Sequence, residues 1–214
     1  MQHGTPIRYF GGMGDAVSDH YRTLEAEAEA ELRVQRSRFL ALAFPIASEA
    51  EFDGRLERIR AQRFDATHHC WAWRLFEPDR ARSSDAGEPS GSAGRPILQA
   101  IHSAALHDAG VVVVRWFGGV KLGTGGLARA YRDAAHAALE AGAVRERWLY
   151  ERLSVTAPHR DANLLFRLVR PPEILLAAST FGAEAHFDLD VRRSLATAVA
   201  AELEGHRLVV KRGG

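Results

Sequence analysis

A run of four valines that leads into a loop with five glycines constrains the fold of this chain most strongly. The stretch VVVVRWF, residues 111–117, is a short continuous apolar run of the kind found in strands that are buried on both faces. Five of the next nine residues, 118–126, are glycine. Apolar residues then recur at helical spacing, and Thr124 and Gly142 are placed to cap and to end this helix. A buried strand joined to a helix in this way indicates an α/β (α+β) protein.

The other sequence patterns predict two domains. In the first half we expect strands from about residue 29, at 37–46 and at 67–76, helices at 48–62 and from residue 96, and a long loop at 77–95. In the second half the order strand, helix, strand, helix, strand, with a further strand near 174–180, predicts a ferredoxin-like domain. We therefore expect a flexible tail at residues 1–24, an N-terminal domain at 25–145 and a ferredoxin-like domain at 146–214.

The composition is that of an ordinary globular protein, with 46% hydrophobic and 26% charged residues. A net charge of +1 provides no overall field that would draw the chain to nucleic acid or to a membrane. No apolar run approaches the roughly 18 residues of a membrane span. Cys70 is the single cysteine, which excludes an intrachain disulfide framework and fits a reducing compartment. We expect a cytoplasmic protein without a membrane partner, with Met13 as an alternative start to Met1.

The glycine-rich segment 118–126, named the glycine loop below, holds the first candidate site. Backbone N–H groups at a helix start are unpaired and partly positive, and glycines let such groups converge on an anion. The segment 111–132 contains four cations and no acid, but neither a Walker A motif nor a dinucleotide fingerprint. We therefore predict a phosphate-like anion as ligand, with the candidate residues Arg115, Gly118, Gly119, Lys121, Gly123, Gly125, Gly126 and Arg129. The alternative is a tight strand-to-helix crossover in which the glycines only allow close packing.

A second loop, SSDAGEPSGSAGRP at residues 83–96, holds two carboxylates three residues apart. Asp85 and Glu88 could coordinate a metal or transfer protons. The alternative is helix capping, in which Glu88, Ser90 or Ser92 accepts hydrogen bonds at the start of the next helix. We include Asp85, Glu88 and Ser90 among the ligand-binding candidates. The two loops are expected to lie side by side and to form one concave site with Lys121 inside it.

The segment THHCWAW, residues 67–73, offers further side chains for chemistry. In a strand, His68 and Cys70 point to one face and His69 to the other. No second cysteine or close histidine pair completes a zinc site, and residues two apart on a strand are too distant for a nucleophilic Cys–His pair. His68 is therefore kept as a ligand-binding candidate, and neither a metal nor a cofactor is expected. The two tryptophans of this segment are either core aromatics or a base-stacking platform.

Three segments together resemble the IMPACT/YigZ family: THHCWAW, SSDAGEPSGSAGRPIL and VVVVRWFGGVKLGTGGLARAY. The resemblance implies an N-terminal two-layer domain similar to domain IV of elongation factor G, followed by a small ferredoxin-like domain. It brings no established catalytic activity. The family's eukaryotic members regulate translation initiation by competing for an activator of a stress kinase. Ala86 stands where the family usually has a second acid, which weakens any paired-acid chemistry.

We accordingly predict a non-catalytic, translation-associated protein that contacts RNA, the ribosome or a translation factor through the basic glycine loop. One alternative is an enzyme that acts on a phosphorylated or otherwise anionic small molecule held between the two loops. The other is a protein-interaction regulator of translation or of a stress response. Replacing the acids would impair an enzyme most, whereas replacing the cations would impair an RNA-binding protein most.

Overall fold

The computed structural model describes residues 19–213, which form two compact units. Residues 21–147 make up one unit, named the α/β unit here. Residues 148–213, together with residues 19 and 20, make up the other, named the ferredoxin-like unit. The chain therefore passes from one unit to the other twice, after His20 and after Arg147. No helix in this described part of the chain is both long enough and apolar enough to cross a membrane.

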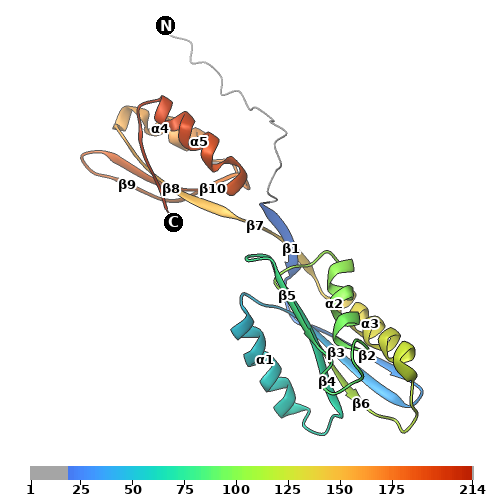
Figure 1. Cartoon of the computed structure of the whole chain (residues 1–214). Coiled ribbons are helices and arrows are strands. Elements are labelled where there is room, and N and C mark those ends of the chain that lie inside the picture. Colours follow the sequence, from blue (N-terminus) through green and yellow to red (C-terminus); the bar gives the residue numbers. More distant parts are fainter. Residues whose placement is uncertain (1–18, 214) are drawn as a thin grey trace. The chain divides into compact units, whose positions relative to one another are not determined.

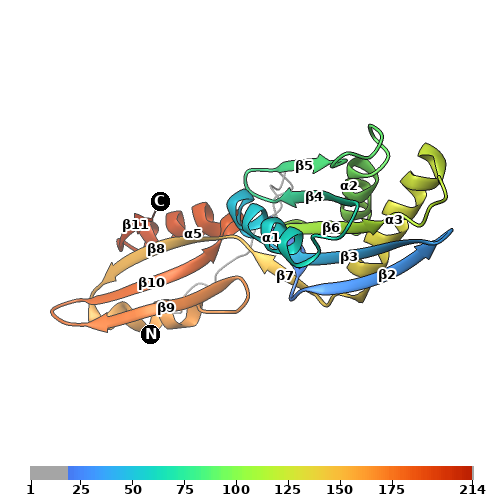
Figure 2. The same ribbon diagram turned by 90° about the horizontal axis from the view of Figure 1, so that it is seen from below.

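A five-stranded antiparallel sheet forms the centre of the α/β unit. Its strand order is β2 (Ala28–Val34), β3 (Ser37–Pro45), β6 (Ala109–Trp116), β4 (His68–Leu75) and β5 (Arg80–Ser84), as Figure 2 shows. The four valines lie in the central strand β6 and are fully buried, as their continuous apolar run predicted. The edge strand β5 lies inside the segment expected to be a long loop. Its polar sequence RARSS does not show the apolar alternation that identifies a strand, because an edge strand can be exposed to solvent.

Helices cover both faces of this sheet. Helix α1 (Glu49–Gln62) packs on one face, and helices α2 (Gly94–Ser103) and α3 (Gly123–Ala141) pack on the other (Figure 1). Alternate valines of β6 supply the two cores: Val111 and Val113 face α2 and α3, whereas Val112 and Val114 face α1. The mixed α/β fold class is thus confirmed, and α1 adds a third layer to the two that were expected.

Strand β1 (His20–Leu24) pairs with β7 (Val144–Trp148) in a separate two-stranded sheet. Residues 19–24 were expected to belong to a tail, of which residues 1–18 lie outside the described residues. The pattern that identifies β1 is short: Tyr21 and Leu24 are buried, and Leu24 joins the core beneath α3. Two apolar residues in a segment of five are too few to predict a strand from sequence.

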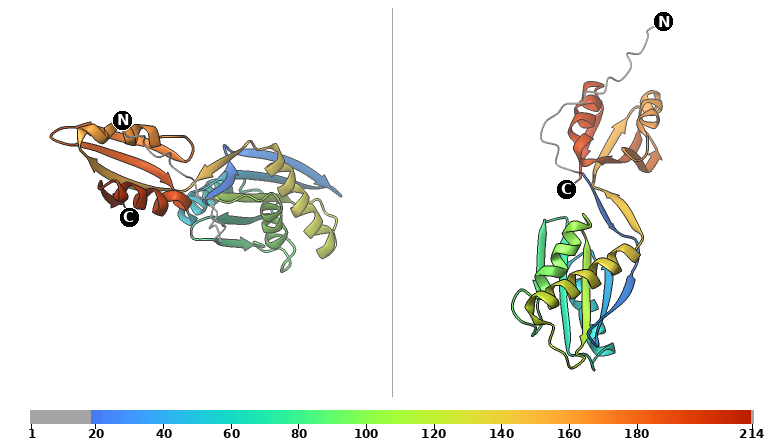
Figure 3. Two further views of the ribbon diagram at one scale, coloured as in Figure 1. Left: turned by 90° about the horizontal axis from the view of Figure 1, so that it is seen from above. Right: turned by 90° about the vertical axis from the view of Figure 1, so that its right-hand side faces the viewer.

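The ferredoxin-like unit is a four-stranded antiparallel sheet with two helices on one face (Figures 1 and 3). Its elements are β8 (Tyr150–Ala157), α4 (Ala162–Leu168), β9 (Ile174–Phe181), β10 (Ala185–Arg192), α5 (Arg193–Gly205) and β11 (Val209–Arg212). The strand order is β11, β8, β10, β9, and every neighbouring pair is antiparallel. Alternating residues of the strands pack against both helices in one core, which is the arrangement predicted for a ferredoxin-like sandwich.

Asp19 fixes the start of helix α5 from the far end of the sequence. Its carboxylate is buried, accepts hydrogen bonds from the Ser194 backbone N–H and hydroxyl, and pairs with Arg192 at 2.9 Å. Burial raises the pKa of the Asp19 carboxyl, but the hydrogen bonds from Arg192 and Ser194 outweigh burial and hold this pKa below its ordinary value. The ferredoxin-like unit is therefore closed by a residue that precedes the α/β unit in the sequence.

Candidate functional site

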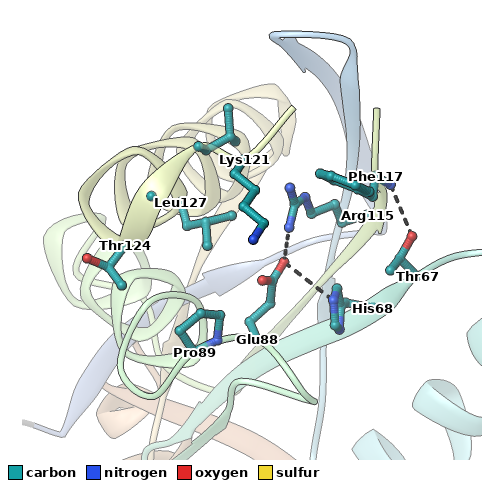
Figure 4. A pocket seen from close by; sticks show the side chains of 11 residues that line it. Thr67, His68, Glu88, Pro89, Arg115, Phe117, Lys121, Thr124 and Leu127 are labelled. Atoms are coloured by element: carbon teal, nitrogen blue, oxygen red, sulfur yellow. Dashed lines mark hydrogen bonds and ion pairs between the residues drawn. The ribbon is translucent and has the colours of Figure 1, made fainter. Parts of the chain in front are cut away.

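A pocket of about 440 Å³ opens in the α/β unit beside the start of helix α3 (Figure 4). The second loop, the end of β6, the start of β4 and the glycine loop all contribute to its wall. The lining residues are Thr67, His68, Glu88, Pro89, Arg115, Phe117, Lys121, Leu122, Gly123, Thr124 and Leu127. The two loops that were expected to lie side by side therefore border one pocket, and Lys121 reaches into it.

A buried ion pair forms one wall of this pocket. Glu88 Oε1 accepts hydrogen bonds from Arg115 Nη1 at 2.5 Å and from the Tyr131 hydroxyl at 2.7 Å. The side chains of Glu88 and Arg115 are 3% and 5% exposed. The second Nη of Arg115 donates to the Ser37 hydroxyl at 3.3 Å, which ties the pair to β3. Buried charges require such partners, because the free-energy cost of removing an unpaired charge from water is high.

Asp85 has the capping role that was considered for Glu88, Ser90 or Ser92. Its Oδ1 accepts from the backbone N–H groups of Ala93 and Gly94 at 2.9 and 2.8 Å, and its Oδ2 accepts from Gly91 at 2.8 Å. Burial raises the pKa of the Asp85 carboxyl, but these three donors outweigh burial and hold the pKa below its ordinary value. Asp85 therefore closes the second loop and opens α2, and it does not line the pocket.

His68 and Cys70 lie on the same face of β4, as the strand alternation predicted. The His68 ring contacts the Ala86 carbonyl through Nδ1 at 3.0 Å and turns Nε2 toward Glu88, 3.9 Å from Oε1. Cys70 is fully buried beneath the pocket and donates to the Asp85 carbonyl at 2.9 Å. Burial raises the pKa of the Cys70 thiol to about 12. A thiol that stays protonated at neutral pH is a poor nucleophile, so Cys70 has a packing role.

Different structural requirements explain the individual glycines of the glycine loop. A Cβ on Gly118 would lie 2.1 Å from the backbone of Arg36, so this glycine lets the β2–β3 turn pack against the loop. Gly119 and Gly123 have φ values of +84° and +69°, which favour glycine. Gly125 has open space around it. Only Gly123 among them lines the pocket, so close packing and turn geometry account for Gly118 and Gly119.

The four cations of this region differ in what they can offer a ligand. Arg115 is neutralised by Glu88, and Arg132 pairs with Asp133 at 3.0 Å, one residue beyond the segment that was counted as acid-free. Lys121 and Arg129 are exposed and make no ion pair among residues 19–213. The positive charge available to a ligand is therefore about half of what the sequence count implied.

The structure also adds pocket residues that the sequence did not single out. Phe117 is 47% exposed at the pocket mouth, and its ring lies 5.4 Å from the Arg115 guanidinium. Tyr131 is fully buried and does not line the pocket, but its hydroxyl donates to Glu88, and its pKa is raised by burial and by its neighbours Cys70 and Glu88. Thr124 was expected to cap α3, but the cap position is Leu122 and no side chain caps the helix. Ser90 is exposed and does not line the pocket.

No group of three or more histidine, cysteine, aspartate or glutamate side chains within residues 19–213 could hold a metal ion. His69 turns to the other face, where its Nε2 meets the Arg63 carbonyl at 3.1 Å. Trp73 is buried in the core beneath α1, and Trp71 packs against that core, which favours the core interpretation of both tryptophans.

These features define a class: an α/β unit with a partly apolar, cationic pocket at a glycine-rich helix start, joined to a ferredoxin-like unit. Residues 35–139 match the Impact N-terminal domain. Over 197 residues the chain is 31% identical to the IMPACT family member YvyE of Bacillus subtilis (strain 168), which covers 90% of this chain and 91% of that protein. The chain belongs to the IMPACT family.

Two further comparisons extend this result. An IMPACT family member of Thermus thermophilus is 52% identical over 106 residues, which are 50% of this chain and 56% of that protein. A solved structure described as that of a hypothetical protein has a TM-score of 0.63 and 23% sequence identity, and it covers 90% of this chain and 96% of that chain. This likeness shows that the fold of both units is shared by a known structure.

Proposed function

We propose that this chain is a translation-associated binding protein that holds a nucleotide of single-stranded RNA in the pocket at the start of α3. The observation that carries the proposal is the meeting of Lys121, the uncapped start of α3 and the exposed ring of Phe117 in one pocket. Single-stranded RNA is recognised by such a combination, in which cations follow the phosphates and aromatic rings stack on bases. The family resemblance to regulators of translation initiation supports the cellular role.

The phosphate would lie between Lys121 and the first turn of α3. Helix α3 has 19 residues and no side-chain cap, so its first N–H groups lack an acceptor of that kind. Figure 4 shows the Lys121 side chain pointing into the pocket from the glycine loop. A full charge and a helix start directed at one space favour an anion there.

The base would stack at the pocket mouth. Phe117 presents about half of its surface to solvent at the mouth of the pocket, so its ring is accessible to a base. Stacking on an aromatic ring contributes about 1–3 kcal/mol per base in single-strand complexes. Arg115 behind the ring keeps it in place, because the guanidinium lies 5.4 Å from the ring centre.

The test uses the two lysines of the chain. Affinity for a fluorescent oligouridine would be measured at several salt concentrations for the wild type, Lys121→Ala and Lys211→Ala. We expect Lys121→Ala to weaken binding and to reduce the slope of log K against log salt by up to about 0.7, the value for one phosphate contact on a single strand. Lys211 lies in the ferredoxin-like unit and is not among the residues that line the pocket, so its replacement should leave the slope unchanged. Equal slopes for all three proteins would contradict the proposal.

One feature favours the enzyme alternative. His68 and Tyr131 both approach Glu88, and a buried carboxylate beside a histidine in a pocket is a common arrangement for acid–base chemistry. Asp85, however, is committed to the backbone of its loop, so the paired acids suggested by the sequence do not meet in the pocket. Undetectable oligonucleotide binding at low salt would move the enzyme and protein-partner alternatives ahead of RNA.

A further inference from the structure

We propose that the pocket selects a guanine base and that Glu88 is the residue that recognises it. The inference rests on the proposed nucleotide-binding function and goes beyond it, because Lys121 and Phe117 would accept any nucleotide. Stacking and phosphate contacts carry no sequence information by themselves. Selection requires a fixed polar group that faces the base edge, and the wall of the pocket contains one.

Glu88 offers a hydrogen-bond acceptor that is held in place. Its Oε1 is engaged by Arg115 and Tyr131 at 2.5 and 2.7 Å, so the carboxylate cannot rotate freely. An ionised carboxylate has about four lone-pair sites, and these two donors occupy only the Oε1 side. Figure 4 shows the other oxygen turned toward Lys121 and Leu127, across the pocket. Since the side chain is only 3% exposed, a ligand reaches this acceptor only from within the pocket.

His68 adds a second acceptor to the same wall. Its Nδ1 lies 3.0 Å from the Ala86 carbonyl, which can only accept, so the proton of the neutral ring is on Nδ1. In the neutral ring, Nε2 is then an acceptor on the Glu88 side of the pocket, where it lies 3.9 Å from Oε1. Two neighbouring acceptors require a ligand that presents N–H donors.

The charge balance permits an anionic ligand despite the carboxylate. Arg115 neutralises Glu88 at close range, whereas Lys121 has no acidic partner among the described residues. The pocket therefore combines hydrogen-bond acceptors with a net positive charge. A nucleotide whose base carries N–H donors fulfils both requirements.

Guanine matches this wall best among the four RNA bases. Its Watson–Crick edge has the N1–H and the N2 amino group side by side, and the two lone pairs of the free Glu88 oxygen can accept from both. Cytosine and adenine present a single amino group beside a ring acceptor. Uracil presents one N–H between two carbonyl groups, which would face the lone pairs of Glu88. A well-placed pair of contacts to a base edge discriminates by about 1–3 kcal/mol in nucleic-acid complexes.

The closing experiment uses the unmodified protein and four probes. These are a uridine heptamer, the same heptamer with a central guanosine, the same heptamer with a central inosine, and free guanosine 5′-monophosphate. We expect the guanosine heptamer to bind about 5- to 150-fold more tightly than the uridine heptamer, with the inosine heptamer between them because it lacks the amino group. Equal affinity for the three heptamers would overturn guanine selection and leave the proposed function standing.

Two other outcomes separate the inference from the proposed function. If free guanosine monophosphate binds as tightly as the guanosine heptamer, guanine recognition is supported and the RNA function fails. If none of the four probes binds, both fail. In the variant arm, Glu88→Gln places a donor where the acceptor was and should abolish the preference for guanosine over uridine, whereas Glu140→Gln, on the exposed face of α3, should retain it. Because the comparison of heptamers is made on the wild type, a misfolded variant does not prevent the test.

Discussion

At the scale of single residues, two acids of one loop have opposite environments. Asp85 binds three backbone N–H groups of its own loop, whereas Glu88 binds side chains from β6 and α3. Asp85 therefore shapes the loop, and Glu88 joins the loop to the rest of the unit. The two carboxylates should respond differently to replacement and to pH.

Replacing Asp85 should weaken the fold at neutral pH and have less effect in acid. Asp85→Asn loses charge-assisted bonds to backbone N–H groups, and we expect the free energy of unfolding to fall by about 2–3 kcal/mol at pH 7. Because the folded pKa of Asp85 lies below its ordinary value of 3.8, the contribution is complete above that value and is lost as the pH falls through the folded pKa. The difference between wild type and variant should therefore shrink below about pH 4.

Urea denaturation across this pH range measures the difference directly. Asp79→Asn is the matched control, since the Asp79 side chain is 70% exposed and its one ion pair, with Arg74, spans 3.5 Å. A variant difference that stays constant from pH 7 to pH 3 would show that the Asp85 charge is not what stabilises the loop.

The Arg115–Glu88 pair should show strong coupling in a double-mutant cycle. Arg115→Met leaves a buried carboxylate without its counterion, and Glu88→Leu leaves a buried guanidinium, so each should reduce the free energy of unfolding by about 3–5 kcal/mol. The double variant removes both charges together and should cost less than the sum of the two by about 2–3 kcal/mol. Additive effects in urea denaturation would mean that the pair is not an energetic unit.

At the scale of elements, the glycine loop joins β6 to α3 by packing against the β2–β3 turn. Gly118 and Gly125 provide a matched pair for this interpretation. Gly118→Ala would drive a Cβ into the backbone of Arg36, and we expect a loss of about 1–3 kcal/mol in the free energy of unfolding. Gly125→Ala meets nothing within 4 Å and lies in the first turn of α3, so it should stabilise the unit by about 0.5–1 kcal/mol. Chemical denaturation that ranks the two variants in the opposite order would rule out the packing role of Gly118.

The main elements could be predicted from the sequence because their apolar periodicity is strong. The four valines predicted β6, the strand-like segment around Leu153 predicted β8, and the alternation around Leu189 predicted β10. The edge strand β5 and the cap of α3 could not be predicted. An exposed edge strand has no apolar pattern, and the start of α3 depends on how the glycine loop packs against another turn.

The candidate site was predictable in its segments but not in the roles of its residues. The sequence analysis predicted that the loops that carry Lys121 and Glu88 lie side by side, and both residues line the pocket. Asp85 caps α2 and Glu88 lines the pocket. Which of the two carboxylates faces the pocket depends on tertiary packing, so it could not be predicted from the sequence. The exposure of Phe117 has the same origin, since it continues an apolar run that is otherwise buried.

At the scale of the whole molecule, each unit has a core of its own. The α/β unit packs two clusters on the faces of its sheet, and the ferredoxin-like unit packs one. We expect two thermal transitions in calorimetry, because domains with separate cores unfold as separate cooperative units. Leu189→Ala should destabilise only the ferredoxin-like transition, by about 2–5 kcal/mol, and Ile101→Ala only the other. Both side chains are fully buried, which makes them comparable. A single transition shifted by either variant would show that the units unfold together.

The contact between Asp19 and the start of α5 has a consequence for the order in which the protein is made. Asp19 leaves the ribosome early, but Ser194 follows it by 175 residues. At a synthesis rate of about 5–20 residues per second, the two are separated by roughly 10–35 seconds. Residues 21–147 are contiguous and can fold during this interval, whereas the carboxylate of Asp19 stays in water until Ser194 has been made. The ferredoxin-like unit, whose chain begins first, is therefore the last to be completed.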